Sequence, residues 1–381
     1  MYSNLPGQKK PQPTFPIADL HCDTVIAMRR GYDIGVRHDN YHLDIPRMRE
    51  GGVKIQVFAT SCLLSEKEIN SFDYVNSQLD LMHEQFARYP DQIAICTNAN
   101  EIKRTIDSGK IAAVLAIEGG LALGNDISRV QYFYDRGVRI ITIAHEAPTG
   151  WCANHKETDP GFHGLNDIGR KFIMEMNRLG IIVDLSHSAD STVEEVLKLS
   201  SAPVIASHSN ARALCNHSRN LADDQIKTIA ATGGLIGVTF VNTFLSEQYN
   251  VAYEKFWSTV SRDDLKRLLK LYSSGLSDEK YQSTLQKDFA FIIEGERKFE
   301  HLRASVSDVV DQIDYMVNLI GPDHVAIGSD FDGMSSTPLG LEDCSKLQSI
   351  TVELAKRGYS DIDIQKISSG NFMRVFEQVC G

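Results

Sequence analysis

Short apolar runs recur along the chain and alternate with longer segments whose apolar residues have helical spacing. The runs are continuously apolar over much of their length and often follow Gly or Pro, which is typical of buried parallel strands. Eight such runs occur, at Ile17–Leu20, Lys54–Thr60, Ala112–Ile117, Arg139–Ala144, Ile181–Leu185, Val204–Ser207, Leu235–Phe240 and Val325–Gly328. The segments between them predict helices, among them Leu165–Leu179, Ser191–Leu199, Asp223–Ala231 and Val306–Leu319.

This alternation of strands and helices predicts an α/β fold with a parallel sheet. Eight strands are the number that closes a (β/α)₈ TIM barrel. An open, doubly wound sheet is the alternative. It is disfavoured because the chain has no G-x-G-x-x-G fingerprint after its first strand and no P-loop. The sequence therefore predicts a TIM barrel.

One connection, between the seventh and eighth predicted strands, is unusually long. Residues 241–303 are charged and favour helices, so they predict a helical insertion rather than an irregular loop. In a barrel this insertion would emerge at the catalytic face. Whether it covers the site, meets a partner subunit or is a solvated addition stays open at this point. After the last strand, Leu341–Arg357 and Asp361–Gln378 predict closing helices, and with no linker in view we expect residues 1–381 to form one domain.

The charge balance limits the partners that the protein can have. The chain has 39 Lys and Arg against 50 Asp and Glu, a net charge of −11. Such an acidic surface argues against a nucleic-acid partner. No run of eighteen apolar residues is present, so we expect no membrane-spanning segment. The 7 cysteines are an odd number without a C-x-x-C pair, which favours reduced thiols and a cytoplasmic location.

Residues able to bind metal ions stand at the ends of six predicted strands. The first strand is followed by both a histidine and an aspartate, which alternation along an extended backbone places on the same side. The full set is His21, Asp23, Glu118, His145, His187, His208 and Asp330. A barrel brings the carboxyl ends of its strands together at one mouth, where barrel enzymes have their active sites. These side chains are therefore predicted to form one functional cluster.

The composition of this cluster indicates its chemistry. It exceeds the three protein ligands of a mononuclear catalytic zinc and suits two divalent ions that share a carboxylate, for which Glu118 is the natural bridge. Such a pair supports metal-assisted hydrolysis. Imidazole with carboxylate favours zinc, while manganese and cobalt remain open. The other histidines, His155 and His163 included, show no such placement and are interpreted as surface or structural residues.

At these residues the sequence resembles the membrane (renal-type) dipeptidase family, zinc-dependent dipeptidases of the amidohydrolase-like barrels. The similarity extends from Asp19 to Phe376. The most specific motifs are D-x-H-x-D at Asp19–Asp23, E-G-G at Glu118–Gly120, D-L-S-H at Asp184–His187, S-H-S at Ser207–Ser209, Arg219-Asn220 followed by Asp223-Asp224, and D-F-D-G at Asp330–Gly333. The ordered set, rather than any single motif, supports the resemblance.

The resemblance implies roles that spacing alone does not assign. It implies two zinc ions, one held by His21 and Asp23, the other by His187 and His208, with Glu118 bridging them. Asp330 would approach the first ion and act as proton acceptor and donor, and a hydroxide bridging the ions would attack the peptide bond. His145 would bind the scissile carbonyl oxygen, and Arg219 the terminal carboxylate of the substrate. The family also implies dipeptide substrates, L-L and often L-D, and a homodimer.

Three hypotheses follow for the function. The first is a two-zinc dipeptidase. The second is another amidohydrolase-type barrel hydrolase, acting on a cyclic amide, a lactone or a phosphoester. Many of those bridge their metals with a carbamylated lysine after the fourth strand, where this chain has Ala144 and His145. The third, a non-catalytic scaffold, would be expected to lack a ligand or a proton shuttle. For the carboxylate clamp, Arg212 lies near Arg219 and competes with it.

Overall fold

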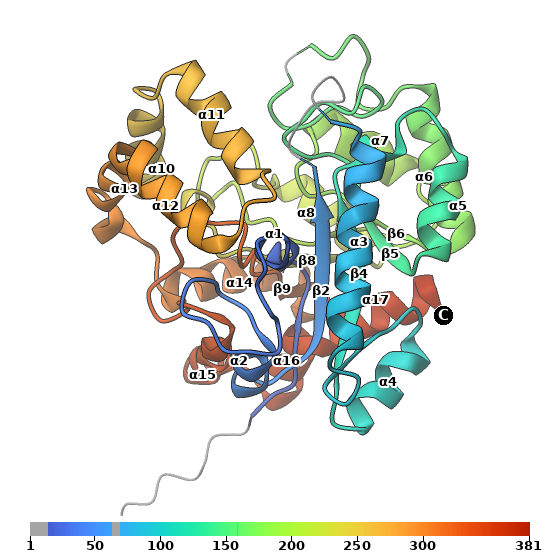
Figure 1. Ribbon diagram of the computed structural model, residues 1–381. Coiled ribbons are helices and arrows are strands. Elements are labelled where there is room, and N and C mark those ends of the chain that lie inside the picture. Colours follow the sequence, from blue (N-terminus) through green and yellow to red (C-terminus); the bar gives the residue numbers. More distant parts are fainter. Residues whose placement is uncertain (1–13, 63–68, 158) are drawn as a thin grey trace, which may run out of the picture.

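The computed structural model describes residues 14–62, 69–157 and 159–381. Eight strands form a closed parallel ring in which β2 pairs with both β1 and β4 and β1 pairs with β9 (Figure 1). The ring consists of β1 (Ile17–Asp19), β2 (Val53–Ser61), β4 (Ile111–Glu118), β5 (Val138–Thr142), β6 (Ile182–Asp184), β7 (Ile205–Ala206), β8 (Leu235–Val238) and β9 (Val325–Ile327). The predicted TIM barrel is confirmed, and all eight predicted strands lie in it.

A ninth strand in the described part of the chain, β3 (Ile93–Ile95), was not expected. It pairs only with β4 and lies outside the ring. Three residues with a single apolar–small–apolar alternation are too short to give a recognisable pattern. The strand does not change the barrel topology.

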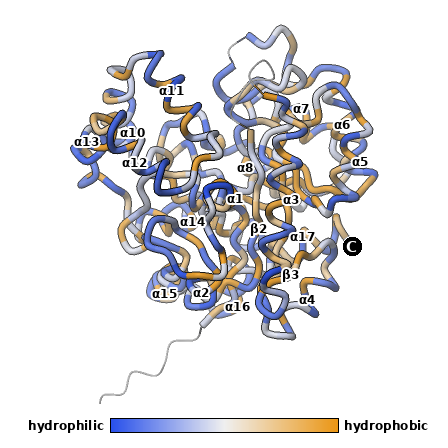
Figure 2. Tube along the Cα trace, in the orientation of Figure 1, coloured by the Kyte–Doolittle hydropathy of each residue, from blue (hydrophilic) through white to orange (hydrophobic). Residues whose placement is uncertain are grey.

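Helices surround the ring on its outside and at one end. Those of the first half are α1 (Thr24–Arg29), α2 (Ile45–Glu50), α3 (Ser71–Ala87), α4 (Ala99–Asp107) and α5 (Ser128–Asp135). Those of the second half are α6 (Asp167–Leu179), α7 (Asp190–Leu199), α8 (Asp223–Ala231), α14 (Val306–Ile320), α15 (Gln348–Lys356), α16 (Asp361–Gln365) and α17 (Asn371–Cys380). In Figure 2 hydrophobic positions concentrate along the strands and on the helix sides that face them.

The helix α6 shows how the local sequence defines an element. Its first turn is capped by Asn166, whose side chain accepts hydrogen bonds from the backbone of Ile168 and Gly169. Apolar residues at helical spacing are buried on one face, and Gly180 ends the helix in a left-handed conformation. A Cβ atom at that glycine would lie 2.7 Å from the Val379 carbonyl oxygen, so no larger residue fits there.

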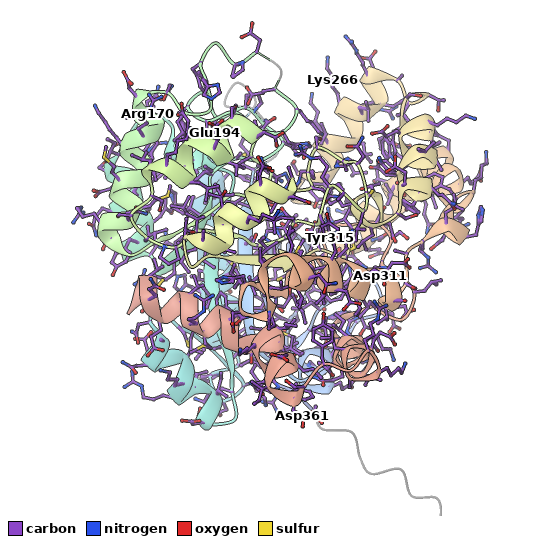
Figure 3. The ribbon with its side chains drawn as sticks, turned by 180° about the vertical axis from the view of Figure 1, so that it is seen from behind. Arg170, Glu194, Lys266, Asp311, Tyr315 and Asp361 are labelled. Carbon is purple, nitrogen blue, oxygen red and sulfur yellow. The ribbon has the colours of Figure 1, made fainter. Side chains whose placement is uncertain are left out.

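Residues 241–303 are helical, as expected. They form α9 (Asn242–Leu245), α10 (Glu247–Trp257), α11 (Arg262–Tyr272), α12 (Asp278–Asp288) and α13 (Ala290–Arg297). The insertion has a small apolar core of its own that includes Leu271 and Phe289. Figure 3 shows Lys266 of α11 at the same end of the molecule as Arg170 and Glu194 of α6 and α7, and Asp361 at the opposite end.

Arg30, just after α1, docks this insertion on the barrel. Its guanidinium donates to the Tyr272 carbonyl oxygen at 3.1 Å and lies 3.5 Å from the centre of the Tyr281 ring. Its own carbonyl oxygen accepts from the Asp278 N–H at 3.0 Å. Since α1 begins directly after Asp23, these contacts hold the insertion against the segment that leads out of the predicted site. No helix in the described ranges is long and apolar enough to span a membrane.

The barrel interior is filled by alternate residues of the strands and closed by α17. Ile55, Val57 and Ala59 of β2 pack in this interior core, and in β4 the inward positions run from Ala112 through Val114 and Ala116. Phe372 and Phe376 of α17 belong to the same core and close it. The next inward position of β4 is Glu118, so the strand period of two directs this carboxylate into the mouth of the barrel.

Phe376→Ala should destabilise the protein by about 3–5 kcal/mol, because Phe376 is fully buried and its removal leaves a cavity under the strands. The midpoint of denaturant unfolding measures this change, with Phe376→Leu as the smaller-loss control. A cost below about 1 kcal/mol for the alanine variant would contradict the role assigned to α17.

Candidate metal centre

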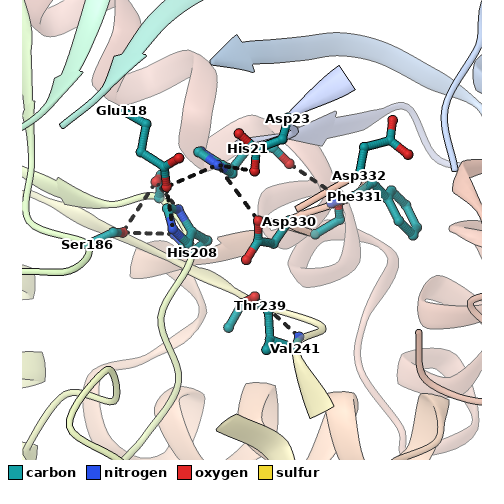
Figure 4. Close-up of polar contacts among 12 residues, drawn as sticks. His21, Asp23, Glu118, Ser186, His208, Thr239, Val241, Asp330, Phe331 and Asp332 are labelled. Atoms are coloured by element: carbon teal, nitrogen blue, oxygen red, sulfur yellow. Dashed lines mark hydrogen bonds and ion pairs between the residues drawn. The ribbon is translucent and has the colours of Figure 1, made fainter. Parts of the chain in front are cut away.

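The structure brings the seven predicted strand-end residues together at the mouth of the barrel. Six of the side chains are buried, and that of Asp330 is 13% exposed. Figure 4 shows His21, Asp23, Glu118, His208 and Asp330 pointing toward one another. His145 and His187 complete the group, in contact with Glu118.

Glu118 lies at the centre of the group. Its Oε1 atom is 3.0 Å from His187 Nε2, 3.3 Å from His208 Nε2 and 3.4 Å from His21 Nε2. Its Oε2 atom is 3.4 Å from His145 Nε2. The same Nε2 atom of His21 also lies 3.6 Å from Asp23 and 3.8 Å from Asp330. One carboxylate is thus shared by His21, which also contacts Asp23 and Asp330, and by His187 and His208.

These donors fit a pair of metal ions. The Nε2 atoms of His187 and His208 are 3.1 Å apart. Two nitrogen ligands of one tetrahedral zinc, each ~2.0–2.1 Å from the ion, lie roughly 3.3–3.4 Å apart. His21 Nε2 and Asp23 Oδ1 are buried without a hydrogen-bond partner in the described part of the chain. A bound cation would satisfy these atoms, which are costly to leave unpaired.

Hydrogen bonds from behind orient His208. Its Nδ1 atom lies 2.7 Å from Ser207 Oγ, which donates to Asp184 at 2.6 Å. When the Nδ1–H of His208 donates to the serine hydroxyl, the lone pair of Nε2 is directed at the metal centre, as a metal ligand requires. Asp184 also accepts from Thr142 at 2.6 Å, so one buried carboxylate ties β5, β6 and the segment after β7 together.

Asp19 ties β1 to the segment after β9. It accepts from the backbone N–H and the hydroxyl of Ser329 at 2.8 and 2.7 Å. Beyond the strand ends, the Asp23 N–H donates to the Phe331 carbonyl oxygen at 2.9 Å and the Asp330 N–H to the His21 carbonyl oxygen at 3.2 Å. Backbone pairing therefore continues into the two segments that supply His21, Asp23 and Asp330, and it fixes their relative positions.

The backbone at the site is locally strained. His187, Asp330 and Asp332 are the non-glycine residues with positive φ in the described ranges, at 66°, 66° and 68°. Such conformations cost roughly 1–3 kcal/mol each and cluster at functional sites. Two glycines make room for the ligands. A Cβ atom on Gly119 would lie 2.8 Å from His145 Cβ, and one on Gly333 would lie 2.3 Å from Asp23 Oδ2.

Burial and charge crowding perturb the site strongly. Burial and the Asp23 charge raise the pKa of Glu118 well above its usual value. Burial raises the pKa of Asp330 to about 7 against the opposing charge of His21. Burial alone would lower the pKa of His21, but the Glu118 and Asp23 charges raise it to about 10. The carboxyl groups resist ionisation and the His21 imidazole resists deprotonation. Both effects show that the negative charge of the site exceeds its positive charge.

Arg219 is the arginine that borders the site. It is buried, it donates to the His208 carbonyl oxygen at 3.3 Å, and it forms no ion pair with any described carboxylate. Its competitor from the sequence, Arg212, forms a bidentate pair with Asp190 at 2.9 and 2.7 Å. Burial lowers the pKa of Arg219, opposed by the charges of Asp330 and Glu146. The structure thus leaves Arg219, and not Arg212, available for an added carboxylate.

Two residues beside the site were not predicted from sequence. Glu146 follows His145, and its Oε1 atom lies 3.2 Å from His155 Nε2 and 3.4 Å from His187 Nδ1. His155, which the sequence placed among the surface or structural residues, lies beside the cluster with its side chain 3% exposed, whereas His163 is exposed. A glutamate directly after a ligand candidate was the available signal for Glu146. The sequence carried no signal for His155, because its position depends on a loop that returns to pair with the segment around His187.

Comparisons with known proteins agree with this geometry. Residues 9–380 match the family model described as membrane dipeptidase (peptidase family M19). A dipeptidase from Aspergillus oryzae, named aclJ, is 30% identical over 96% of this chain and 78% of its own length. Human dipeptidase 3 is 29% identical over 96% of this chain, which spans 65% of the human protein.

Solved structures show the same fold. A Rhodobacter sphaeroides metallopeptidase, described with a phosphinate mimic of the dipeptide L-Ala-D-Ala, has a TM-score of 0.77 at 22% identity, over 96% of this chain and 100% of the other. A probable dipeptidase from Pseudomonas aeruginosa, PvdM, has a TM-score of 0.74 at 23% identity, over 94% and 98%. Since the family model covers nearly the whole chain, the protein belongs to the membrane dipeptidase family, peptidase family M19.

Proposed function

We propose that the protein is a two-zinc dipeptidase that hydrolyses the peptide bond of free dipeptides, L-L and L-D. The observation that supports this most is that the ligand cluster centred on Glu118 lies beside Arg219, a buried arginine without an ion-pair partner among the described residues. The cluster suits metal-assisted hydrolysis, and the arginine suits a substrate with a free carboxylate. The names of the relatives support the reaction class.

The residues divide into two ligand groups that share Glu118. His21 and Asp23 would hold one zinc ion, with Asp330 beside them, and His187 and His208 would hold the other. Bound zinc ions supply Lewis acidity and lower the pKa of water to near neutrality. Zinc is the ion that mixed imidazole and carboxylate ligands favour.

Asp330 is the proposed proton shuttle. Peptide hydrolysis forms a bond from a water oxygen to the carbonyl carbon, breaks the C–N bond and moves a proton to the departing amine. The Asp330 carboxyl lies 3.8 Å from His21, and both it and the Asp23 carboxylate pack against Gly333, where a Cβ atom would lie 2.4 Å from Asp330 Oδ1 and 2.3 Å from Asp23 Oδ2. A group that accepts and then returns a proton works best with a pKa near the working pH. At 13% exposed, the Asp330 side chain is the most accessible of the seven cluster side chains, as contact with a substrate requires.

His145 is the proposed donor to the scissile carbonyl oxygen. Burial lowers the pKa of His145 to about 4, so the ring is neutral and keeps a single N–H. Its Nε2 atom faces Glu118, and its Nδ1 atom is buried without a hydrogen-bond partner in the described ranges. A donor positioned for the oxyanion is worth roughly 3–4 kcal/mol in transition-state stabilisation.

A homodimer in the cytoplasm remains part of the proposal. The cytoplasmic location is supported by Cys22, Cys96, Cys152, Cys215 and Cys344, which are buried free thiols, as reducing compartments favour. The insertion offers a surface for a second subunit, with Val251 57% exposed on α10 and Phe291 43% exposed on α13. Light scattering of the purified protein measures the subunit number.

Zinc-loaded protein should cleave L-L and L-D dipeptides, and the chelated protein should not. The comparison uses one dipeptide panel, a C-terminally amidated set and a set of lactones and phosphoesters. Restored cleavage on adding zinc back is the control for irreversible unfolding. Cleavage confined to lactones or phosphoesters would contradict the proposal in favour of another amidohydrolase-type reaction.

Arg219→Ala should raise KM for free-carboxylate dipeptides by about 10–100-fold, because a charged hydrogen-bonded pair contributes roughly 1.5–3 kcal/mol. The already poor KM for amidated dipeptides should stay unchanged. Arg212→Ala is the matched control, since Arg212 is paired with Asp190. An equal loss on free and amidated substrates would indicate that Arg219 is a structural residue.

A further inference from the structure

Glu146 belongs to a polar cluster that the proposed reaction does not use. The cluster joins Glu146 to His155, Lys156 and His187 on the outer side of the metal centre. Lys156 donates to Oε2 of Glu146, and His155 and His187 approach Oε1. The carboxylate is 32% exposed, whereas the His155 side chain is 3% exposed. Glu146 therefore sits between solvent and a metal ligand.

The loop after β5 is held against the His187 segment by its backbone. The His155 N–H donates to the His187 carbonyl oxygen at 2.8 Å, and the Ala189 N–H donates to the Ala153 carbonyl oxygen at 3.0 Å. Asn154 and Ser188 form an antiparallel bridge between the same segments. Because of this pairing, the contact of Glu146 and His155 with His187 is a fixed feature of the fold and not a chance meeting of long side chains.

The two ring nitrogens of His187 face different groups. Nε2 faces the centre, 3.0 Å from Glu118 and 3.1 Å from His208. Nδ1 is buried without a hydrogen-bond partner in the described ranges, and the nearest carboxylate oxygen, Oε1 of Glu146, lies 3.4 Å away. Nε2 binds a metal only if the ring proton is on Nδ1, and a carboxylate at Nδ1 favours that tautomer and raises the basicity of the ligand.

We propose that Glu146 is a positioning residue for the metal ligand His187, holding the ring in the Nδ1–H tautomer and in the orientation that directs Nε2 at the metal centre. This inference rests on the proposed two-zinc centre. His208 has a comparable arrangement through Ser207 and Asp184. Each histidine of the second ligand group therefore has an acceptor beside Nδ1. For His187 it is the charged Glu146 carboxylate, and for His208 it is the neutral Ser207 hydroxyl, which in turn donates to Asp184.

A separate metal ion held by Glu146, His155 and His187 is a less economical explanation of the same cluster. It would require His187 to bind metals through both nitrogens, which means losing both ring protons. On its other side, His155 has its Nδ1 atom 2.8 Å from the Ser218 hydroxyl. Since Ser218 precedes Arg219, His155 also connects Glu146 to the segment that presents the buried arginine.

The test is the zinc affinity of Glu146→Gln, measured on the full-length holoprotein by competition with chelators of graded strength. The substitution keeps the size of the side chain and removes its charge. We expect one of two bound zinc ions to be held about 10–100-fold more weakly. Glu157→Gln is the matched control: Glu157 is in the same loop and accepts from the Asn154 N–H at 2.9 Å. This control should bind zinc as the unmodified protein does.

A double variant identifies which ion is affected. If Glu146 acts through His187, Glu146→Gln should cause no further loss of zinc affinity in a His187→Ala background. Unchanged zinc affinity in E146Q, loss of a third zinc equivalent, or a full additional loss in the double variant would overturn the inference. If E146Q does not fold, His155→Gln serves as the second variant, because it removes the other imidazole that contacts the Glu146 carboxylate. It should weaken the binding of the same zinc ion, and unchanged binding would overturn the inference.

The unmodified protein separates this inference from the proposal on which it rests. Two zinc equivalents in the unmodified protein and unchanged affinity in E146Q would contradict the role of Glu146 alone. Fewer than two equivalents in the unmodified protein would contradict the two-zinc centre itself. Melting of the chelated forms gives the structural comparison, and a lower melting temperature without altered zinc affinity counts against positioning.

Discussion

The crowding of Asp23, Glu118 and Asp330 in the buried mouth of the barrel is the constraint on which the rest of the site depends. Three acidic groups share a space with four imidazoles, and the Nε2 atoms of three of these meet one oxygen of Glu118. Without added positive charge, such burial costs several kcal/mol per ion. The raised pKa values of Glu118 and Asp330 express the same cost. Bound cations would relieve this cost by supplying the missing positive charge.

The fold maintains this costly arrangement through rigid support. Backbone pairing continues beyond β1 and β9 into the ligand segments, and Asp19 and Asp184 bind neighbouring strands together beneath the ligands. The left-handed backbones of His187 and Asp330 add strain at the same place. These costs are offset by the apolar interior of the barrel below, which α17 closes. The outer contacts of Glu146 extend this support to the second ligand group.

The sequence predicted the features that depend on the two-residue period of the strands and on their order along the chain. The inward phase of β4 leads to Glu118, and the ends of the other strands deliver the remaining ligands, so the barrel and the cluster followed from alternation. Glu146 and His155 did not follow, because their contacts depend on a loop that returns to pair with the His187 segment. Sequence also did not separate Arg219 from Arg212, since only the structure shows the Asp190 partner. The docking of the insertion by Arg30 was likewise a tertiary property.

The proposed function requires Glu118 to bridge two zinc ions at the mouth of the barrel. Anomalous diffraction from a zinc-loaded crystal, collected on both sides of the zinc absorption edge, tests it most directly. A bridging Glu118 predicts two peaks roughly 3.5–4 Å apart, one beside His21 and Asp23 and the other beside His187 and His208, with Glu118 between them. A single peak, or two peaks that do not share Glu118, would contradict it.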